Sequence, residues 1–392
     1  MKILLVSSGS GSRGGGEIFL KYLGEGLTER RHEVVMWIPN HPRMDELAAK
    51  CARFARIIRA DYRNTYDYRA RSLSTCFNWG VPRRVAGEWK ALRPDVIHIN
   101  KQNLEDGLDL LRAAQRCGVP SVCTIHLTQT ADYLRAKAAW LRDQIARWQL
   151  SRYKGVLVAV QEGRCRALRK LVAERVRTKT ILNGVPRVDA VALRSLREAK
   201  RKELGFAESD FVVLGLGRLV AQKRPFLFLH IAKELHKQFP AAKFLWVGDG
   251  ELAEQWKRAI AREKLDDVVS CAGWQADVLP FLLAGDLLLH VARFEGLPFA
   301  LIEAMAAGLP CAVTCGFSFE MPFFNEENIL LVDGVKDLAE RMRNPLDLAH
   351  VAGRGRRLIE DKLSVHNMVK SYEQLYLDVT ERAAPALSLR SN

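Results

Sequence analysis

Short apolar stretches of strand length alternate with amphipathic helical stretches along almost the whole sequence, and the alternation occurs twice. In the first half we expect helices near 17–30 and 104–117, and strands at 2–7, 33–38, 94–99, 120–126 and 155–160. The second half starts again, with expected helices such as 226–238 and 299–307 and strands at 211–216, 243–247, 268–271, 286–291, 311–314 and 329–332. This order is typical of parallel sheets covered by helices on both faces. The chain is therefore predicted to be α/β, with two doubly wound, Rossmann-like domains.

The turn-forming run Asn183-Gly184-Val185-Pro186 separates the two halves. We expect domains at residues 1–185 and 186–364, followed by a terminal helix and tail at 365–392. A length of 392 residues fits this division, since domains commonly have about 100–200 residues. Two α/β lobes of similar build predict a ligand in the cleft between them, outside the carboxyl ends of the strands.

The charge is distributed unevenly between the two halves. The whole chain has 60 Lys and Arg against 45 Asp and Glu, a net charge of +15. Residues 1–185 contain 33 basic and 17 acidic side chains, whereas residues 186–392 contain 27 and 28. The excess in the first half indicates an anionic partner.

The sequence gives no sign of export or of a membrane-spanning helix. No stretch of spanning length is free of charged residues, and the N-terminus lacks the pattern of a signal peptide. The eight cysteines are scattered without a Cys-x-x-Cys pair, which is typical of reduced thiols in the cytosol. We therefore expect a cytoplasmic protein.

A glycine-rich loop, residues 7–17, lies between the first strand and the first helix. Its backbone N–H groups at a helix N-terminus suit a phosphate or another anion. Gly9, Gly11 and Gly14 formally match the dinucleotide-binding fingerprint, which leaves an NAD(P)-dependent oxidoreductase as an alternative. The second strand ends without the acidic residue that would hold a ribose, which disfavours that interpretation.

The segment from Glu295 to Pro310 carries the most specific signals. Pro298 suits the first turn of a helix, Gly308 its C′ position, and Pro310 the residue beyond it. A diphosphate fits the helix start at Gly296 and Leu297. Glu303 lies about 7 Å further along the axis and can reach a ribose, while Glu295 can reach a hexose.

This Glu-x7-Glu segment resembles the signature of family-four retaining glycosyltransferases, also called glycosyl transferases group 1, which have the two-lobed GT-B fold. The resemblance covers nearly the whole chain. It includes further segments that match family motifs: Gly14–Glu17, Asp95–His98, Thr124–His126, Asn183–Val185, Gly217–Leu219 with Lys223, and Val247–Gly250. It also implies that the terminal helix crosses back onto the first lobe.

The resemblance implies a role for each matching position. Arg218 and Lys223 would neutralise the leaving diphosphate, Glu295 would contact the transferred sugar, Glu303 the ribose, and His126 the sugar near its 6-hydroxyl. The other residues implied in donor binding are Gly15, Gly16, Gly217, Gly248, Gly273, Trp274, Gly296, Leu297 and Pro298. A pair of cations can replace a metal, and no Asp-x-Asp is present. We expect no metal and no cofactor, with a UDP- or GDP-linked sugar as co-substrate.

Three positions depart from the family pattern. The usual Gly-Gly-x-x-Glu keeps one glycine in residues 316–320, the second histidine of a His-x-His is Asn100, and the glycine after Lys223 is Arg224. None of these changes touches the residues expected to bind the diphosphate, and the first two concern the donor sugar and the acceptor. A nucleic-acid partner is not expected, because no known nucleic-acid-binding module is present.

Two basic segments concentrate the charge of the first half. Arg53, Arg56, Arg59 and Arg63 recur every three or four residues, and a helix expected at 131–153 carries arginines beside Trp140 and Trp148. Basic helices with such apolar residues suit an anionic membrane surface. We therefore expect a phosphorylated or lipid-linked acceptor, such as a cell-envelope glycolipid or polysaccharide precursor, and an enzyme on the inner face of the plasma membrane. A small soluble acceptor is the alternative.

Overall fold

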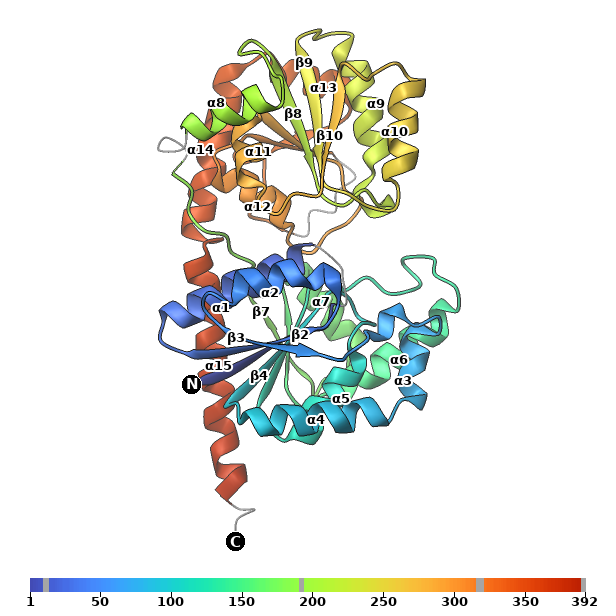
Figure 1. The fold of residues 1–392 in the computed structure, drawn as a ribbon, viewed down its shortest axis with the longest axis vertical. Helices are drawn as coiled ribbons and strands as arrows, with labels where there is room; N and C mark the ends of the chain where they lie inside the picture. The colour runs from blue at the N-terminus through green and yellow to red at the C-terminus, as the bar shows by residue number, and fades with distance from the viewer. Residues whose placement is uncertain (10–13, 190–193, 315–320, 389–392) are drawn as a thin grey trace. The chain divides into compact units, whose positions relative to one another are not determined.

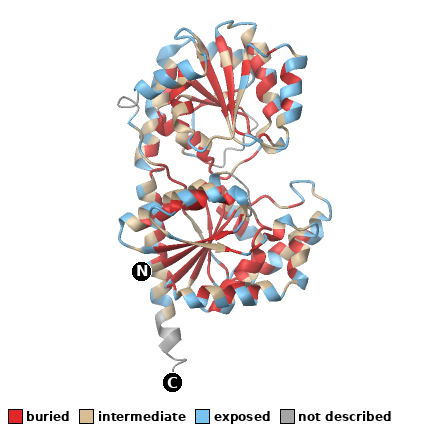
Figure 2. Cartoon of the chain, in the orientation of Figure 1, coloured by how far each residue is buried: buried red, intermediate tan, exposed pale blue. Residues whose placement is uncertain are grey.

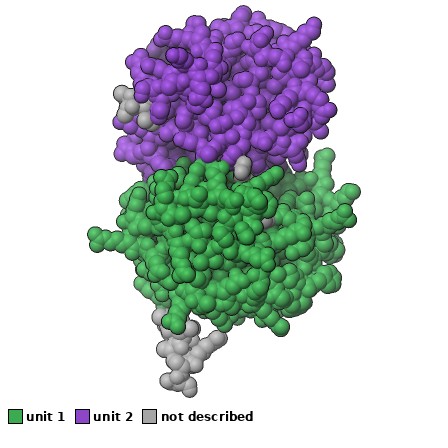
Figure 3. Space-filling view, viewed as in Figure 1, with its two compact units in different colours: residues 1–184, 365–392 green, residues 185–364 purple. Residues whose placement is uncertain are grey.

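A computed structural model describes residues 1–9, 14–189, 194–314 and 321–388, with side chains described as far as Ala383. The chain divides into two units (Figure 3). The first contains residues 1–184 together with 365–392, and the second contains residues 185–364. The boundary expected at residue 185 thus lies between Gly184 and Val185, and the terminal helix is part of the first unit.

The described residues of the first unit form a seven-stranded parallel sheet in the order β3-β2-β1-β4-β5-β6-β7. In the central strand β1, Ile3, Leu4, Leu5 and Val6 are fully buried, because helices cover both faces of the sheet. Leu4 pairs with Val35 on one side and with Ile97 on the other. The strands are β1 Lys2–Ser7, β2 Glu33–Pro39, β3 Arg56–Ala60, β4 Val96–Lys101, β5 Ser121–Ile125, β6 Val156–Ala159 and β7 Arg177–Thr180.

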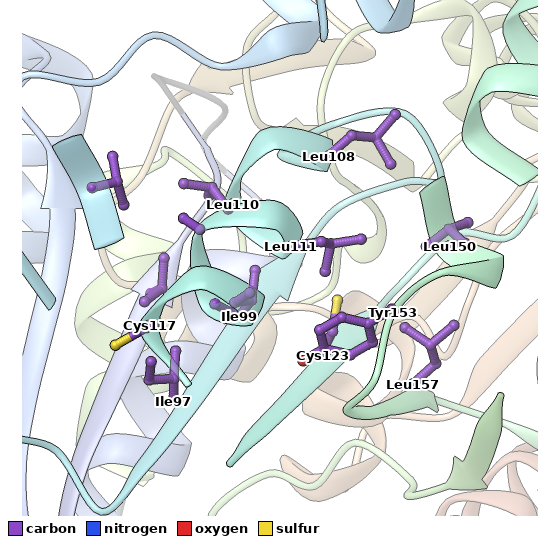
Figure 4. Packing of buried hydrophobic residues seen from close by; sticks show 14 of the residues in the cluster. Ile97, Ile99, Leu108, Leu110, Leu111, Cys117, Cys123, Leu150, Tyr153 and Leu157 are labelled. Carbon is purple, nitrogen blue, oxygen red and sulfur yellow. The ribbon is translucent and has the colours of Figure 1, made fainter. Parts of the chain in front are cut away.

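Helices cover both faces of this sheet (Figure 1). On one face, Leu110 and Leu111 of α5 pack with Ile97 and Ile99 of β4 in the core shown in Figure 4. The helices of this unit are α1 Gly15–Glu29, α2 Asp45–Cys51, α3 Ser74–Phe77, α4 Gly80–Leu92, α5 Leu108–Cys117, α6 Ala139–Ser151, α7 Glu162–Leu171 and α15 Val365–Ser388. Short 3₁₀ turns are η1 Pro42–Met44, η2 Thr65–Asp67 and η3 Arg71–Leu73.

The second unit has a six-stranded parallel sheet in the order β10-β9-β8-β11-β12-β13. Its strands are β8 Phe211–Leu216, β9 Ala242–Val247, β10 Val269–Gly273, β11 Leu287–His290, β12 Cys311–Thr314 and β13 Leu330–Val332. Its helices are α8 Arg194–Glu203, η4 Ala221–Lys223, α9 Pro225–His236, α10 Ala253–Arg262, α11 Leu279–Ala284, α12 Phe299–Ala306, α13 Val335–Met342 and α14 Pro345–Asp361. An aromatic cluster of Phe228, Phe244, Trp246 and Trp256 fills the core beside β9. In both units the central strands are buried along most of their length (Figure 2), whereas the edge strands β3 and β7 are largely half-buried.

The terminal helix α15 packs against α1 of the first unit. Gly26 permits the close approach, since a Cβ there would lie 2.6 Å from the Val369 side chain. Glu373 accepts hydrogen bonds from Arg30 and pairs with His32 at 2.8 Å. Among the helices described, none is long and apolar enough to span a bilayer.

The expected alternation is confirmed in both halves, but two basic segments differ from the prediction. Residues 56–60 form the edge strand β3 rather than part of a basic helix, and Ile57 pairs with Met36 of β2. Arg59 pairs there with Asp45 at 2.7 Å. The helix expected at 131–153 is confined to Ala139–Ser151, because the chain has left-handed φ values at Arg135 and Ala138.

Candidate functional site

The carboxyl ends of the second unit's strands bring three glycines of the expected donor site together. Gly217 follows β8, Gly248 follows β9, and Gly273 ends β10. Gly217 and Gly248 have φ values of +141° and +137°, which other residues rarely adopt. A Cβ on Gly248 would lie 2.2 Å from the Gly217 carbonyl oxygen, and the Gly248 N–H donates to the Gly273 carbonyl at 2.8 Å. Glycine therefore allows these three loops to meet.

Lys223 and Glu295 form an ion pair beside these glycines. Their side chains are only 16% and 9% exposed. Gln222 connects the loops that carry them, because its side chain donates to the Phe294 carbonyl at 2.9 Å and its own carbonyl accepts from the Arg293 N–H at 2.8 Å. The sequence predicted separate roles for Lys223 and Glu295, and the fold places the two side chains in contact.

Two arginines add positive charge to this edge of the sheet. Arg218 is exposed, and in the described part of the chain its guanidinium has no ion pair or hydrogen bond. Arg224 donates to the Val291 carbonyl at 2.5 Å and to Thr314 Oγ1 at 2.9 Å, joining the ends of β11 and β12. Burial first, and then Lys223 and Arg224, lower the pKa of His290 far below its usual value, which keeps this ring neutral.

The conformation of Arg224 explains the departure noted at this position. Its φ of +49° is left-handed, a conformation that glycine adopts without strain. The two hydrogen bonds of the guanidinium stabilise the arginine in that conformation. Sequence reasoning treated Arg224 as a departure and missed its position among the site loops. A cation immediately before Pro225, which starts α9, was the available signal.

The helix α12 follows the Glu295 loop and ends as predicted. Gly308 lies at C′ with a φ of +77°, and the Gly308 and Leu309 N–H groups donate to Met305 and Ala304 carbonyls at 3.0 Å each. This is a Schellman motif. Pro298 differs from the prediction: it is the N-cap residue, one position before the first helical turn.

The other predicted residues of this unit lie around α12 and β10. Gly296 and Leu297 are buried ahead of α12, and Glu303 is half-buried in its middle. Trp274 is half-buried directly after β10, next to Gly273, whose φ is +66°. Thus Arg218, Lys223, Glu295 and the three loop glycines share one edge of the sheet.

The predicted residues of the first unit meet at the carboxyl end of its own sheet. His126 follows β5, and its Nε2 lies 2.8 Å from Asn100 Oδ1 on β4. The Asn100 amide group donates to the Gly16 carbonyl at 3.0 Å, so its oxygen faces His126. Gly16 is buried against Gln102, where a Cβ would overlap the amide, while Gly15 is exposed at the start of α1.

These contacts determine the state of His126. Burial lowers its pKa to about 4, so the imidazole is neutral at neutral pH. Nε2 must donate to the Asn100 oxygen, which leaves Nδ1 as a hydrogen-bond acceptor. Sequence reasoning recognised Asn100 only as the substitute for a histidine, and its bridging role between Gly16 and His126 was missed.

His98 has a structural role in the same region. Its Nδ1 lies 2.5 Å from the Tyr376 hydroxyl and its Nε2 2.8 Å from Thr124 Oγ1, which also contacts the Tyr372 hydroxyl. Burial, and then the nearby His126, lower the pKa of His98 to about 3. This histidine therefore anchors α15 to the first sheet. Gly11 and residues 316–320 lie outside the described residues.

Two family models match this chain. The model described as Glycosyltransferase Family 4 matches residues 13–187, and the model described as Glycosyl transferases group 1 matches residues 197–353. The chain belongs to glycosyltransferase family 4. The second match contains every predicted donor residue of the second unit, and the first contains His126, Gly15 and Gly16.

Curated proteins similar to this family 4 chain include bacterial glycosyltransferases. UDP-Gal:alpha-D-GlcNAc-diphosphoundecaprenol alpha-1,3-galactosyltransferase of Escherichia coli is 31% identical over 150 residues, 38% of this chain and 39% of that protein. Alpha-monoglucosyldiacylglycerol synthase of Acholeplasma laidlawii is 23% identical over 76% of this chain and 79% of that protein. In three of the curated relatives, the matched region covers only 39%, 34% and 18% of their own lengths.

Solved structures of similar fold cover nearly all of this chain. HepE of Anabaena in complex with UDP-glucose has a TM-score of 0.74 at 20% identity, with 95% of this chain and 98% of that chain covered. Sucrose-phosphate synthase of Thermosynechococcus elongatus has a TM-score of 0.74 at 18% identity, with 97% and 99% covered. The family 4 chain therefore has the two-unit α/β architecture called GT-B, as its sequence predicted.

Proposed function

We propose that this protein is a glycosyltransferase that moves a sugar from a nucleoside-diphosphate sugar to a hydroxyl group of an acceptor, with retention of the anomeric configuration. The observation that carries this proposal is the contact between Lys223 and Glu295 beside Gly217. A cation for the diphosphate and a carboxylate for the sugar stand side by side on loops at one edge of a parallel sheet. This edge is where α/β folds bind nucleotides.

The proposed reaction assigns each side chain a task. Lys223 and Arg218 stabilise the negative charge that develops on the leaving diphosphate, as fixed cations stabilise a transition state. Glu295 binds hydroxyl groups of the transferred sugar and orients Lys223, and Glu303 binds the ribose. His126 accepts a hydrogen bond from the sugar through Nδ1. The acceptor oxygen attacks from the face that the diphosphate leaves, and a phosphate oxygen takes its proton.

We propose UDP as the nucleotide, with GDP as the alternative. Support comes from the UDP-glucose complex of HepE and from the UDP-galactose named for the Escherichia coli relative. The cations of the site replace a metal in this scheme, and no cofactor takes part. An NAD(P)-dependent oxidoreductase is not favoured, because the matching family models are those of glycosyltransferases.

We propose a lipid-linked or phosphorylated acceptor and a peripheral position on the inner face of the plasma membrane, in cell-envelope glycolipid or polysaccharide synthesis. Support comes from two relatives, one named for a diphosphoundecaprenol-linked acceptor and one for a diacylglycerol product. The positive charge of the first half suits such a surface. Arg59 of β3 forms an ion pair with Asp45 of α2, so the charges near α6 suit the membrane better than those of residues 53–63.

Thermal unfolding with UDP, GDP, ADP and NAD tests the proposed donor. A ligand at about a hundred times its dissociation constant stabilises the protein by about 2.7 kcal/mol. We expect UDP to raise the unfolding temperature most, and Lys223→Ala to reduce that rise. Lys336→Ala, which removes an exposed lysine of the same unit, is the matched control. A rise with NAD alone would refute the proposal.

A further inference from the structure

A cavity of about 380 Å³ lies within the first unit, apart from the residues assigned above to the donor sugar. It is formed by η3 with the residues just before it and by the start of α6. Its lining residues are Arg69, Ala70, Arg71, Leu73, Ala136, Lys137, Ala138 and Arg142. Four of these eight residues are cationic and none is acidic. The lining therefore has the charge of an anion-binding site.

The four cations differ in how they are held. Arg142 is buried and binds Glu105 with two hydrogen bonds, at 2.8 Å and 2.5 Å, so its charge is already compensated. Arg71 lies over the Tyr66 ring, 4.1 Å from its centroid. Arg69 and Lys137 are exposed, and no ion pair involves either within the described residues. At least two positive charges are thus available to a ligand.

The backbone adds to the electrostatic preference of this cavity. Ala138 is the N-cap residue of α6 and lines the cavity, so the positive end of the helix dipole lies at its wall. The first turn of α6 contains no acidic residue. An anion with two charges, such as a phosphate or diphosphate group, complements this arrangement.

Exposed hydrophobic side chains are frequent in the stretches of chain next to the residues that line the cavity. In the described part of the chain, seven of the eleven exposed large hydrophobic residues belong to residues 77–79 or 133–148: Phe77, Trp79, Tyr133, Leu134, Trp140, Leu141 and Trp148. Phe77 is 85% exposed and Trp140 is 73% exposed. Phe77 ends α3, and α3 and α6 both contact η3 at the cavity. Aromatic residues beside cations are typical of surfaces that enter the membrane interface.

We propose that this cavity binds the phosphate or diphosphate group of a lipid-linked acceptor, while Phe77 and Trp140 insert into the membrane interface. The inference rests on the proposed function, because it assigns the acceptor of that reaction. A phosphate held by Arg69 and Lys137 would fix the depth at which the acceptor's sugar leaves the membrane. The cavity therefore selects acceptors that carry a phosphate between lipid and sugar.

Binding of inorganic pyrophosphate to the full-length protein, measured by calorimetry with the donor site saturated by UDP, tests the cavity. We expect Arg69→Glu/Lys137→Glu to weaken pyrophosphate binding by at least about tenfold, since charge-assisted hydrogen bonds to phosphate are lost. Lys90→Glu/Arg147→Glu is the matched control. It changes the charge equally at exposed residues of α4 and α6 that do not line the cavity.

Co-sedimentation with phosphatidylcholine vesicles, with and without phosphatidic acid, tests the lipid. We expect binding only when phosphatidic acid is present. Arg69→Glu/Lys137→Glu and Phe77→Ala/Trp140→Ala should each abolish it, while the second pair keeps pyrophosphate binding. Equal pyrophosphate affinity in the cavity and control variants would overturn the site. Pyrophosphate binding without vesicle binding would overturn the lipid-linked acceptor.

UDP affinity, measured on the same variants, separates this inference from the proposed function. We expect Arg69→Glu/Lys137→Glu to leave UDP affinity unchanged, because Lys223 and its neighbours lie in the other unit. If the wild-type protein did not bind UDP, the donor assignment would be refuted. Pyrophosphate would still report on the cavity in that case.

Discussion

Lys223 and Glu295 neutralise each other in a largely buried setting, and this pairing affects both folding and catalysis. Removal of one partner takes the opposite charge away from a largely buried group, which is costly. Arrival of a diphosphate would give Lys223 a second anionic partner without requiring Glu295 to withdraw. We therefore regard the pair as a preorganised charge that does not need to be assembled when the donor binds.

We expect Lys223→Ala and Glu303→Ala each to reduce kcat about a hundred- to a thousandfold. Loss of one preorganised contact at a developing charge costs about 2.7–4 kcal/mol. Initial rates with a UDP-sugar, together with circular dichroism to verify folding, provide the measurement. Near-wild-type turnover in folded Lys223→Ala would contradict the role of this lysine.

The cations of the site also predict that the reaction needs no divalent metal. Arg218 and Lys223 supply the positive charge that a metal would otherwise supply to the diphosphate. We expect full activity in EDTA and no stimulation by Mn²⁺ or Mg²⁺. Loss of turnover in EDTA, restored by either metal, would show that the two side chains do not suffice.

His98 and His126 make the stability of the protein depend on pH. Their folded-state pKa values, about 3 and about 4, lie below the unfolded value of about 6.5, so protonation favours the unfolded chain. Their full contribution is present above about pH 6.5. It falls by about 2 kcal/mol per histidine by about pH 5. The free energy of unfolding, measured with urea above about pH 6.5 and again at about pH 5, gives this loss.

A substitution of His98 measures how much of this pH-dependent loss of stability comes from that histidine. We expect His98→Gln to lose less stability than the wild type over the same pH interval, whereas His350→Gln, at an exposed histidine, should behave as the wild type. An identical decline in all three proteins would show that other groups cause the pH dependence.

At the scale of elements, the apolar runs predicted the strands well. The periodic spacing of the arginines, in contrast, wrongly predicted a helix where β3 lies. The central strands are continuous apolar runs because both of their faces are buried, and such runs are visible in the sequence. In Arg56–Ala60, Ile57 and Ile58 form a strand that lies at the sheet edge, where one side is unpaired and arginines are tolerated. The spacing of those arginines follows from solvent exposure and carries no helical signal.

The end of α12 could be predicted from the sequence, because the C′ position of a helix commonly has a left-handed φ that favours glycine. We expect Gly308→Ala to destabilise the protein by about 1–2 kcal/mol, since its φ of +77° is left-handed although no atom obstructs a Cβ. Gly87→Ala, in the middle of α4 with open space around it, should stabilise by about 0.5–1 kcal/mol. Urea unfolding measures the change in the free energy of unfolding for both variants. Equal changes would contradict the assignment of strain to a side chain at Gly308.

At the scale of the whole molecule, local sequence patterns predicted fewer of the contacts, because many of these join residues far apart in the chain. The donor residues share motifs with a known family, so the second unit's site could be listed from the sequence. The contacts of Asn100 with Gly16 and of His98 with Tyr376 join residues 84 and 278 positions apart, and no local pattern predicts them. The cavity lined by Arg69 and Lys137 is equally nonlocal, because it requires η3 and α6 to meet.

The packing of α15 on α1 predicts effects confined to the first unit. We expect Gly26→Leu to separate the two helices, because even a Cβ there would overlap Val369, and overpacking costs about 1–3 kcal/mol. Hydrogen exchange should increase in α1, α15 and β4 and stay unchanged in β8 and β9. A uniform increase across both sheets would show that α15 stabilises the chain in another way.

The chain leaves the first unit after Gly184 and returns at Val365. A ribosome therefore finishes the second unit before it has made the helix that completes the first. Until Tyr372 and Tyr376 emerge, His98 and Thr124 have no hydroxyl partners from α15, and Phe19 lacks its contact with the Tyr372 ring. The first unit therefore cannot complete its packing until the second unit has been synthesised. A chain cut short before residue 365 would leave apolar and polar groups of α1 and β4 uncovered, although its second unit would be complete.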